Sequence, residues 1–94
     1  MKLSVPLLLK MLGEQGHRCA LTDEPLTPNN CVLDHIVPLA KGGSNEIDKV
    51  QLITKEANAA KATMGQGEFI EMCMNVARKH ASKSWLRTNL GIEQ

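Results

Sequence analysis

The middle of the chain, residues 33–61, constrains the fold most because secondary-structure signals follow one another there in a fixed order. Residues 33–39 are strand-like, with a proline near their end, and a loop rich in turn residues follows. The alternation of residues 50–53 predicts a second strand. Thr54 then stands at a helix N-cap position before the alanine-rich segment 55–63. This order predicts an α+β domain with two strands and a helix at its centre.

Helices are predicted on both sides of this core. In residues 5–15 apolar side chains recur at three- and four-residue steps, with a glycine after them, and residues 68–81 repeat the pattern. The tail 83–90 is expected to add one or two turns. The apolar stripe of the second helix is expected to lie in the core. Its members are Phe69, Met72, Cys73, Val76 and Ala77.

The length of the chain predicts one domain. With 94 residues, 43% of them hydrophobic, we expect a single domain over residues 1–94, with the core motif at about 19–62. Between the first helix and the centre, the short apolar pieces 19–21 and 31–33 are separated by turns and predict a short strand or two.

Charge and composition exclude several classes of function. A formal net charge of +1 excludes a strongly basic protein that coats nucleic acid. Phe69 and Trp85 are the only aromatic residues, which argues against a stacking platform for single-stranded bases. The apolar run 5–12 is far shorter than the roughly 20 residues of a membrane span and lacks a signal-peptide cleavage site. We therefore expect a cytoplasmic protein without a membrane partner.

The cysteines do not form a recognisable framework. Cys19, Cys31 and Cys73 are an odd number at irregular spacing, and none lies in a CxxC pair. Neither a disulfide scaffold nor a zinc site is implied. Buried or idle thiols are the simplest interpretation.

The pair Asp34-His35 carries the residue types that phosphodiester cleavage requires. That reaction needs a base to activate water and a cation to neutralise developing charge. Histidine titrates near about pH 6.5 and aspartate is a hard oxygen ligand suited to Mg²⁺. Adjacent side chains of a regular strand face opposite ways. A shared site therefore requires a distortion at His35 or a site that wraps around the strand edge.

A second oxygen ligand is expected from the following helix, where Asn58 is the natural candidate. Two protein ligands would leave most of the Mg²⁺ shell to water and phosphate, as is usual for this ion, and Mn²⁺ or another divalent ion could substitute. Lys61 lies three residues later on the same helical face and is predicted to meet the bound phosphate. Lys41 is a second phosphate-binding candidate, within a rim of lysines that an ordinary solvated surface would equally explain.

These residues resemble the HNH endonucleases, also called His-Me finger nucleases. The resemblance covers about half the chain and rests on Leu33 to Leu39, Gly42 to Asn45, Val50 to Ile53 and Asn58 to Lys61. Asn58 follows Asp34 by 24 positions, similar to the spacing in the HNH domain of RNA-guided CRISPR nucleases. The resemblance implies a ββα-metal core of the HNN-like variant. In that variant the position of His35 supplies the base, and those of Asp34 and Asn58 hold the metal.

The chain departs from the family pattern at two places. Three of the four cysteines of the family's structural zinc site are missing, so no structural zinc is expected. Lys49 stands where the family's middle Asn pins the loop behind the catalytic histidine. Lysine cannot accept a hydrogen bond. Asn45 or Asp48 could take over this support.

The resemblance implies a Mg²⁺-dependent endonuclease that hydrolyses phosphodiester bonds in DNA. No recognition helix or zinc finger is evident, so we expect nicking with low sequence specificity, unless a homodimer or a larger protein partner supplies it. The main alternative is a catalytically inactive module that binds DNA or supports assembly. A zinc-binding interaction domain is a third interpretation, disfavoured by the missing cysteines. A phage source is an expectation from the family alone.

Overall fold

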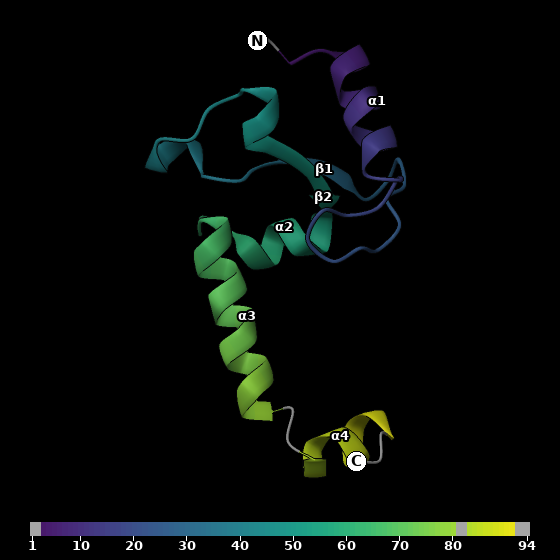
Figure 1. Ribbon diagram of the computed structural model, residues 1–94, viewed down its shortest axis with the longest axis vertical. Coiled ribbons are helices and arrows are strands. Elements are labelled where there is room, and N and C mark those ends of the chain that lie inside the picture. The colour runs from purple at the N-terminus through teal and green to yellow at the C-terminus, as the bar shows by residue number, and fades with distance from the viewer. Residues whose placement is uncertain (1–2, 81–82, 92–94) are drawn as a thin grey trace.

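The computed structural model of the protein describes residues 3–80 and 83–91. The elements are α1 (Val5–Glu14), β1 (Cys31–His35), β2 (Val50–Thr54), α2 (Lys55–Lys61), α3 (Gln66–His80) and α4 (Lys83–Leu90), with two 3-10 turns, η1 (Leu39–Lys41) and η2 (Ile47–Lys49), between the strands. The two antiparallel strands and the helices give the α+β class expected from the sequence, with the strands between α1 and α2 and with α3 and α4 extending away from them (Figure 1). Among the described residues, no helix is both long and apolar enough to cross a membrane.

The hairpin of β1 and β2 forms the centre of the core. Its register pairs Cys31 with Thr54 and His35 with Val50. Every residue of β2 is buried, and Ile53 is fully so. Burial on both faces explains why this strand is apolar throughout except for Gln51 and its cap residue. The buried apolar cluster joins α1, the following loop, β2 and α2, and consists of Met11, Cys19, Leu26, Val50, Leu52, Ile53 and Ala57.

Helix α1 begins and ends as its sequence predicts. The Ser4 side chain accepts a hydrogen bond from the Leu7 amide, and proline occupies the first turn. Just past the helix, the Gln15 side-chain amide pairs with β2: its oxygen accepts from the Leu52 N–H at 3.0 Å and its nitrogen donates to the Leu52 carbonyl at 2.9 Å. The two bonds satisfy backbone groups of β2 that β1 does not reach.

The turn region before β1 is less regular than expected. Residues 19–21 do not form a strand; an isolated bridge between Arg18 and Pro25 closes the segment instead. The Cys19 thiol lies in the core and accepts a hydrogen bond from the Thr54 N–H at 3.3 Å. Side-chain packing and local turns therefore replace the predicted first strand.

The helices after β2 meet their predicted positions with shifted ends. Thr54 caps α2 through a hydrogen bond from the Ala57 amide, and α2 stops at Lys61 because Ala62 adopts a positive φ of 51°. Helix α3 starts two residues before the expected position, at Gln66, and residue 81, its predicted end, lies outside the described residues.

The predicted burial of the α3 stripe is wrong for most of its length. Phe69 is buried, at 9% exposure, but Met72 and Val76 are 43% and 56% exposed and Cys73 also faces solvent. Helix α3 leads away from the strands in Figure 1, so only its first turns can reach the core. The periodic pattern correctly predicted a helix but not what covers its apolar side.

Candidate active site

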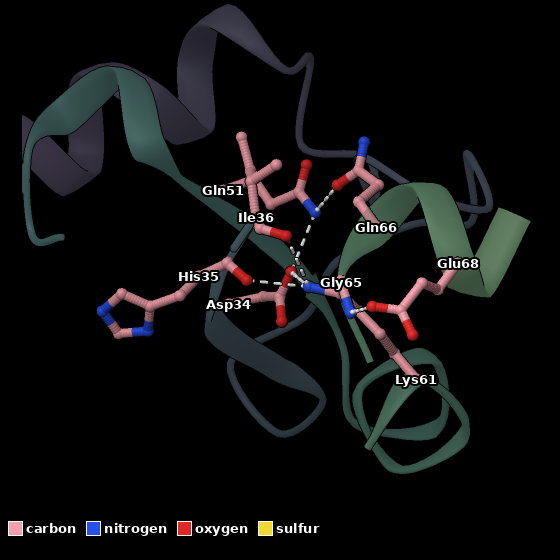
Figure 2. Close-up of polar contacts among 8 residues, drawn as sticks. All are labelled: Asp34, His35, Ile36, Gln51, Lys61, Gly65, Gln66 and Glu68. Carbon is pink, nitrogen blue, oxygen red and sulfur yellow. Dashed lines mark hydrogen bonds and ion pairs between the residues drawn. The ribbon is translucent and has the colours of Figure 1, made fainter. Parts of the chain in front are cut away.

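The strand register sets Asp34 inside the junction between the hairpin and α2. Asp34 is paired across the sheet with Gln51 and is only 6% exposed. The Gln51 amide nitrogen donates to Asp34 Oδ2 at 2.9 Å and to Gln66 Oε1 at 2.6 Å (Figure 2). Because Gln66 is the first residue of α3, this bridge connects the carboxylate to the start of that helix.

Lys61 completes the surroundings of this carboxylate. At the last position of α2 it is 1% exposed, and its ammonium nitrogen lies 2.7 Å from Asp34 Oδ2. The same nitrogen donates to the His35 carbonyl at 2.7 Å and to the Ile36 carbonyl at 3.4 Å, as Figure 2 shows. An ammonium group has three N–H donors. All three are directed at oxygens of β1 and the residue after it.

This placement differs from the expected phosphate contact of Lys61. Lys61 lies one turn after Asn58, as the sequence indicates, but the Lys61 side chain is buried against β1 whereas Asn58 is exposed. A buried lysine is tolerated when it is paired and fully hydrogen-bonded, and both conditions hold here. Lys61 therefore supports the backbone and carboxylate of β1, and its geometry leaves phosphate contacts to other residues.

His35 points away from the Asp34 cluster, as alternation along a strand requires (Figure 2). Its Nε2 lies 2.7 Å from the Asn45 Oδ1 in the loop between the strands. An amide oxygen can only accept, so Nε2 carries the proton and Nδ1 keeps its lone pair. In the neutral imidazole this contact places the proton on Nε2 and leaves Nδ1 as the acceptor. Asn45, expected to support the loop, contacts the imidazole itself.

The glycine pair allows this loop to fold back on β1. Gly42 has a φ of +92°, and a Cβ on Gly43 would lie 1.8 Å from the Val37 carbonyl oxygen. The Gly43 amide donates to the Pro38 carbonyl at 3.0 Å. Only glycine fits such a close backbone approach. This turn sets the path of the loop that carries Asn45.

Lys49 and Lys41 have contacts of other kinds. The Lys49 carbonyl accepts from the Ile36 amide at 3.0 Å, while its side chain is exposed. The Lys41 ammonium group lies 3.0 Å from Glu68 Oε1, and both side chains are exposed. The hydrogen bond from Lys41, together with the Gly65 amide and the lysine charge, lowers the pKa of Glu68. Lys41 can therefore bind another group only if it gives up this exposed ion pair with Glu68.

Asp34 and Asn58 carry oxygen atoms of the kind that a hard divalent cation binds. Among the described residues, the hydrogen bonds to the Asp34 carboxylate all reach Oδ2, which leaves Oδ1 for another partner. Asn58 is exposed on α2, one turn before Lys61, whose side chain reaches that carboxylate. Carboxylate and amide oxygens are ligands that Mg²⁺ accepts, with water completing the shell. Within the described part of the chain, no group of three or more His, Cys, Asp or Glu is placed to hold a metal ion.

Gln51 and Gln66 were not identified from the sequence. A signal existed for Gln51, because a polar residue inside a strand that is otherwise apolar needs a buried partner. For Gln66 there was none: it lies between Gly65 and Gly67 just before a predicted helix, a pattern typical of a surface position.

The three thiols lie in different surroundings. Burial acts to raise the pKa of Cys19, but hydrogen bonds from the Thr22 side chain and from backbone amides, including that of Thr54, hold it below its ordinary value. Burial, with a smaller effect of Cys19, raises the pKa of Cys31. Cys73 is exposed on α3.

Comparison with known proteins gives a structural relative. No protein-family model matches the sequence, and no curated protein matches it. The fold is similar to part of the crystal structure of the Type II-C Cas9 enzyme from Actinomyces naeslundii, with a TM-score of 0.64 and 26% sequence identity over 71% of this chain. The match spans 7% of the Cas9 chain, so it concerns one small part of a large enzyme. The chain thus has an HNH-like fold that is also present in a nuclease.

Proposed function

We propose that this protein is a metal-dependent endonuclease of the HNH type that nicks DNA with low sequence specificity. The observation that carries the proposal is the 2.7 Å contact between His35 and Asn45, which leaves Nδ1 of His35 as the proton acceptor at the end of β1, on the side of the strand opposite Asp34. The likeness to part of a Cas9 enzyme supports the same function.

In this mechanism His35 acts as the general base. Its Nδ1 accepts a proton from the water that attacks the phosphorus, and the Asn45 oxygen keeps the imidazole in the required tautomer and orientation. Asn45 thereby performs the supporting role that Lys49 cannot. The proton acceptor and the carboxylate lie on opposite sides of β1, so the scissile phosphate would sit where the strand ends at His35.

Asp34 Oδ1 and the Asn58 amide oxygen would hold Mg²⁺, with Mn²⁺ as a substitute. When bound, the cation would neutralise charge on the phosphate and on the leaving 3′ oxygen. Lys61 and Gln51 hold Asp34 from its other oxygen, so the carboxylate is oriented before any ion arrives. Lys41 is the exposed lysine that we assign to the phosphate backbone, in exchange for its pairing with Glu68.

Conversion of supercoiled plasmid to nicked and linear forms tests the proposal. Wild-type protein should nick with Mg²⁺ or Mn²⁺ and not with EDTA, and His35→Ala should reduce the rate by at least about 10²-fold. His80→Ala, which removes an exposed histidine at the end of α3, is the matched control and should nick like wild type. Nicking retained by a folded His35→Ala variant would remove the mechanism. Absence of cleavage with any metal would favour the inactive DNA-binding module.

A further inference from the structure

The two residues assigned to the metal carry almost no net charge when the neighbouring Lys61 is counted with them. Asp34 contributes one negative charge, but the Lys61 ammonium nitrogen lies 2.7 Å from Oδ2 of the same carboxylate. The Asn58 amide is neutral. Among residues 3–80 and 83–91, no group of three or more His, Cys, Asp or Glu is placed to hold a metal ion. In the free protein a divalent cation would therefore meet one compensated carboxylate and one neutral oxygen.

Lys61 is not free to leave when a cation arrives. It is 1% exposed, and besides Asp34 it donates to the His35 and Ile36 carbonyls. If the Lys61 side chain moved outward, these carbonyl oxygens would lose their hydrogen bonds inside the junction, where unsatisfied polar groups are costly. A cation at Oδ1 would thus face the ammonium group across a single carboxylate. At a partly buried site such repulsion is much stronger than in water.

A DNA phosphodiester carries the negative charge that this ligand set lacks. Its non-bridging oxygens are also ligands that Mg²⁺ favours. Resting on the function proposed above, we propose that the divalent cation and the DNA phosphate bind this protein interdependently, because Lys61 has already neutralised Asp34. The free protein then binds the metal weakly, and DNA raises metal affinity by the same factor as metal raises DNA affinity.

Binding measurements on His35→Ala, which should leave the DNA intact, test this coupling. Free Mn²⁺ is quantified by electron paramagnetic resonance during titration of the protein alone, a short DNA duplex alone and their complex. DNA affinity is measured by fluorescence anisotropy with Mn²⁺ and with EDTA at matched ionic strength. We expect Mn²⁺ to raise the affinity for DNA, and DNA to raise the affinity for Mn²⁺, by at least about tenfold. Equal Mn²⁺ affinity of the free and DNA-bound protein would overturn the inference.

Lys61→Met tests the assigned cause. It keeps most of the side-chain length and removes the charge, so the free protein should bind Mn²⁺ at least about tenfold tighter and the coupling should shrink. Lys55→Met is the matched control, because Lys55 is an exposed lysine on the same helix. Equal Mn²⁺ affinities of the two folded variants would contradict a role of Lys61. If Lys61→Met does not fold, the binding measurements on His35→Ala still decide whether metal and DNA bind interdependently.

These binding readouts separate the inference from the proposed function. Coupled binding to His35→Ala, with no nicking by wild type, would remove the nuclease proposal and leave the coupling. Metal-dependent nicking without coupled binding would remove the coupling alone.

Discussion

Two regions of the protein differ in which residues they bury. One is the junction of β1, β2 and α2, and the other is the helix α3. The junction buries charged and polar side chains, Asp34, Gln51 and Lys61, each with hydrogen-bond partners. Helix α3 exposes apolar ones, among them Met74 at 53% and Val76 at 56%. From polarity alone, the residues of the junction would be expected at the surface and those of the α3 stripe in the core.

The comparison teaches that contacts, not residue types, decide which region is sensitive to substitution. Polar groups in the junction satisfy one another in a low-dielectric setting, where losing one partner leaves the other unsatisfied. The exposed apolar residues of α3 gain little on folding because they remain in water. The predictions below test this contrast, beginning with the largest expected effect.

Lys61→Met should lower the free energy of unfolding by about 3–5 kcal/mol, because it leaves the buried Asp34 carboxylate without its charged partner and with only the hydrogen bond from Gln51. Chemical denaturation without metal measures the change. Lys55→Met, on the exposed side of α2, should stay within about 0.5 kcal/mol of wild type. A loss below about 1 kcal/mol for Lys61→Met would mean that the ion pair does not hold the junction together.

Phe69→Ala should cost about 3 kcal/mol, because Phe69 is the buried apolar residue of the described part of α3. Met74→Ala, five residues further along and half exposed, should change stability by no more than about 0.5 kcal/mol. Thermal and chemical unfolding of both variants provide the comparison. A large loss for Met74→Ala would show that its side chain is covered in solution.

Gly43→Ala should cost about 1–3 kcal/mol and slow nicking, because the added Cβ would overlap the Val37 carbonyl and displace the loop that carries Asn45. Unfolding and plasmid-nicking assays measure the two effects. Gly13→Ala is the control: its Cβ meets nothing within 4 Å inside α1, and it should stabilise the protein by about 0.5–1 kcal/mol. If Gly43→Ala nicked at the wild-type rate, the loop that carries Asn45 would not be needed to position His35.

Lys41→Met should raise the pKa of Glu68 back toward its ordinary value, because the Lys41 hydrogen bond is the largest cause of its lowering. Carboxyl chemical shifts followed by NMR during an acid titration measure the pKa. Since the folded pKa is lowered, the ion pair is present above the ordinary carboxylate pKa and is lost as pH falls through the folded value. Global stability should barely respond, because both side chains are exposed. An unchanged Glu68 pKa in Lys41→Met would exclude this pairing in solution.

The sequence alone determined the elements and the residues with distinctive chemistry. Strand alternation, the Thr54 cap, the glycine pair and helical periodicity are local signals, so β2, α1, α2 and the class of fold were predictable. The Asp34-His35 pair and the spacing to Asn58 indicated a nuclease-like core through their resemblance to the HNH endonucleases. The exposure of the apolar stripe on α3 was not predictable, because periodicity identifies an apolar face without indicating what packs against it.

Only the tertiary structure decided the partners of these residues. Lys61 lies on the predicted face of α2, but the packing of that helix against β1 turned an expected phosphate ligand into a buried partner of Asp34. The path of the loop brought Asn45, and not Lys49, to the imidazole of His35. Both outcomes depend on contacts between residues at least ten positions apart, and such contacts follow from how the elements pack, which local sequence signals do not encode.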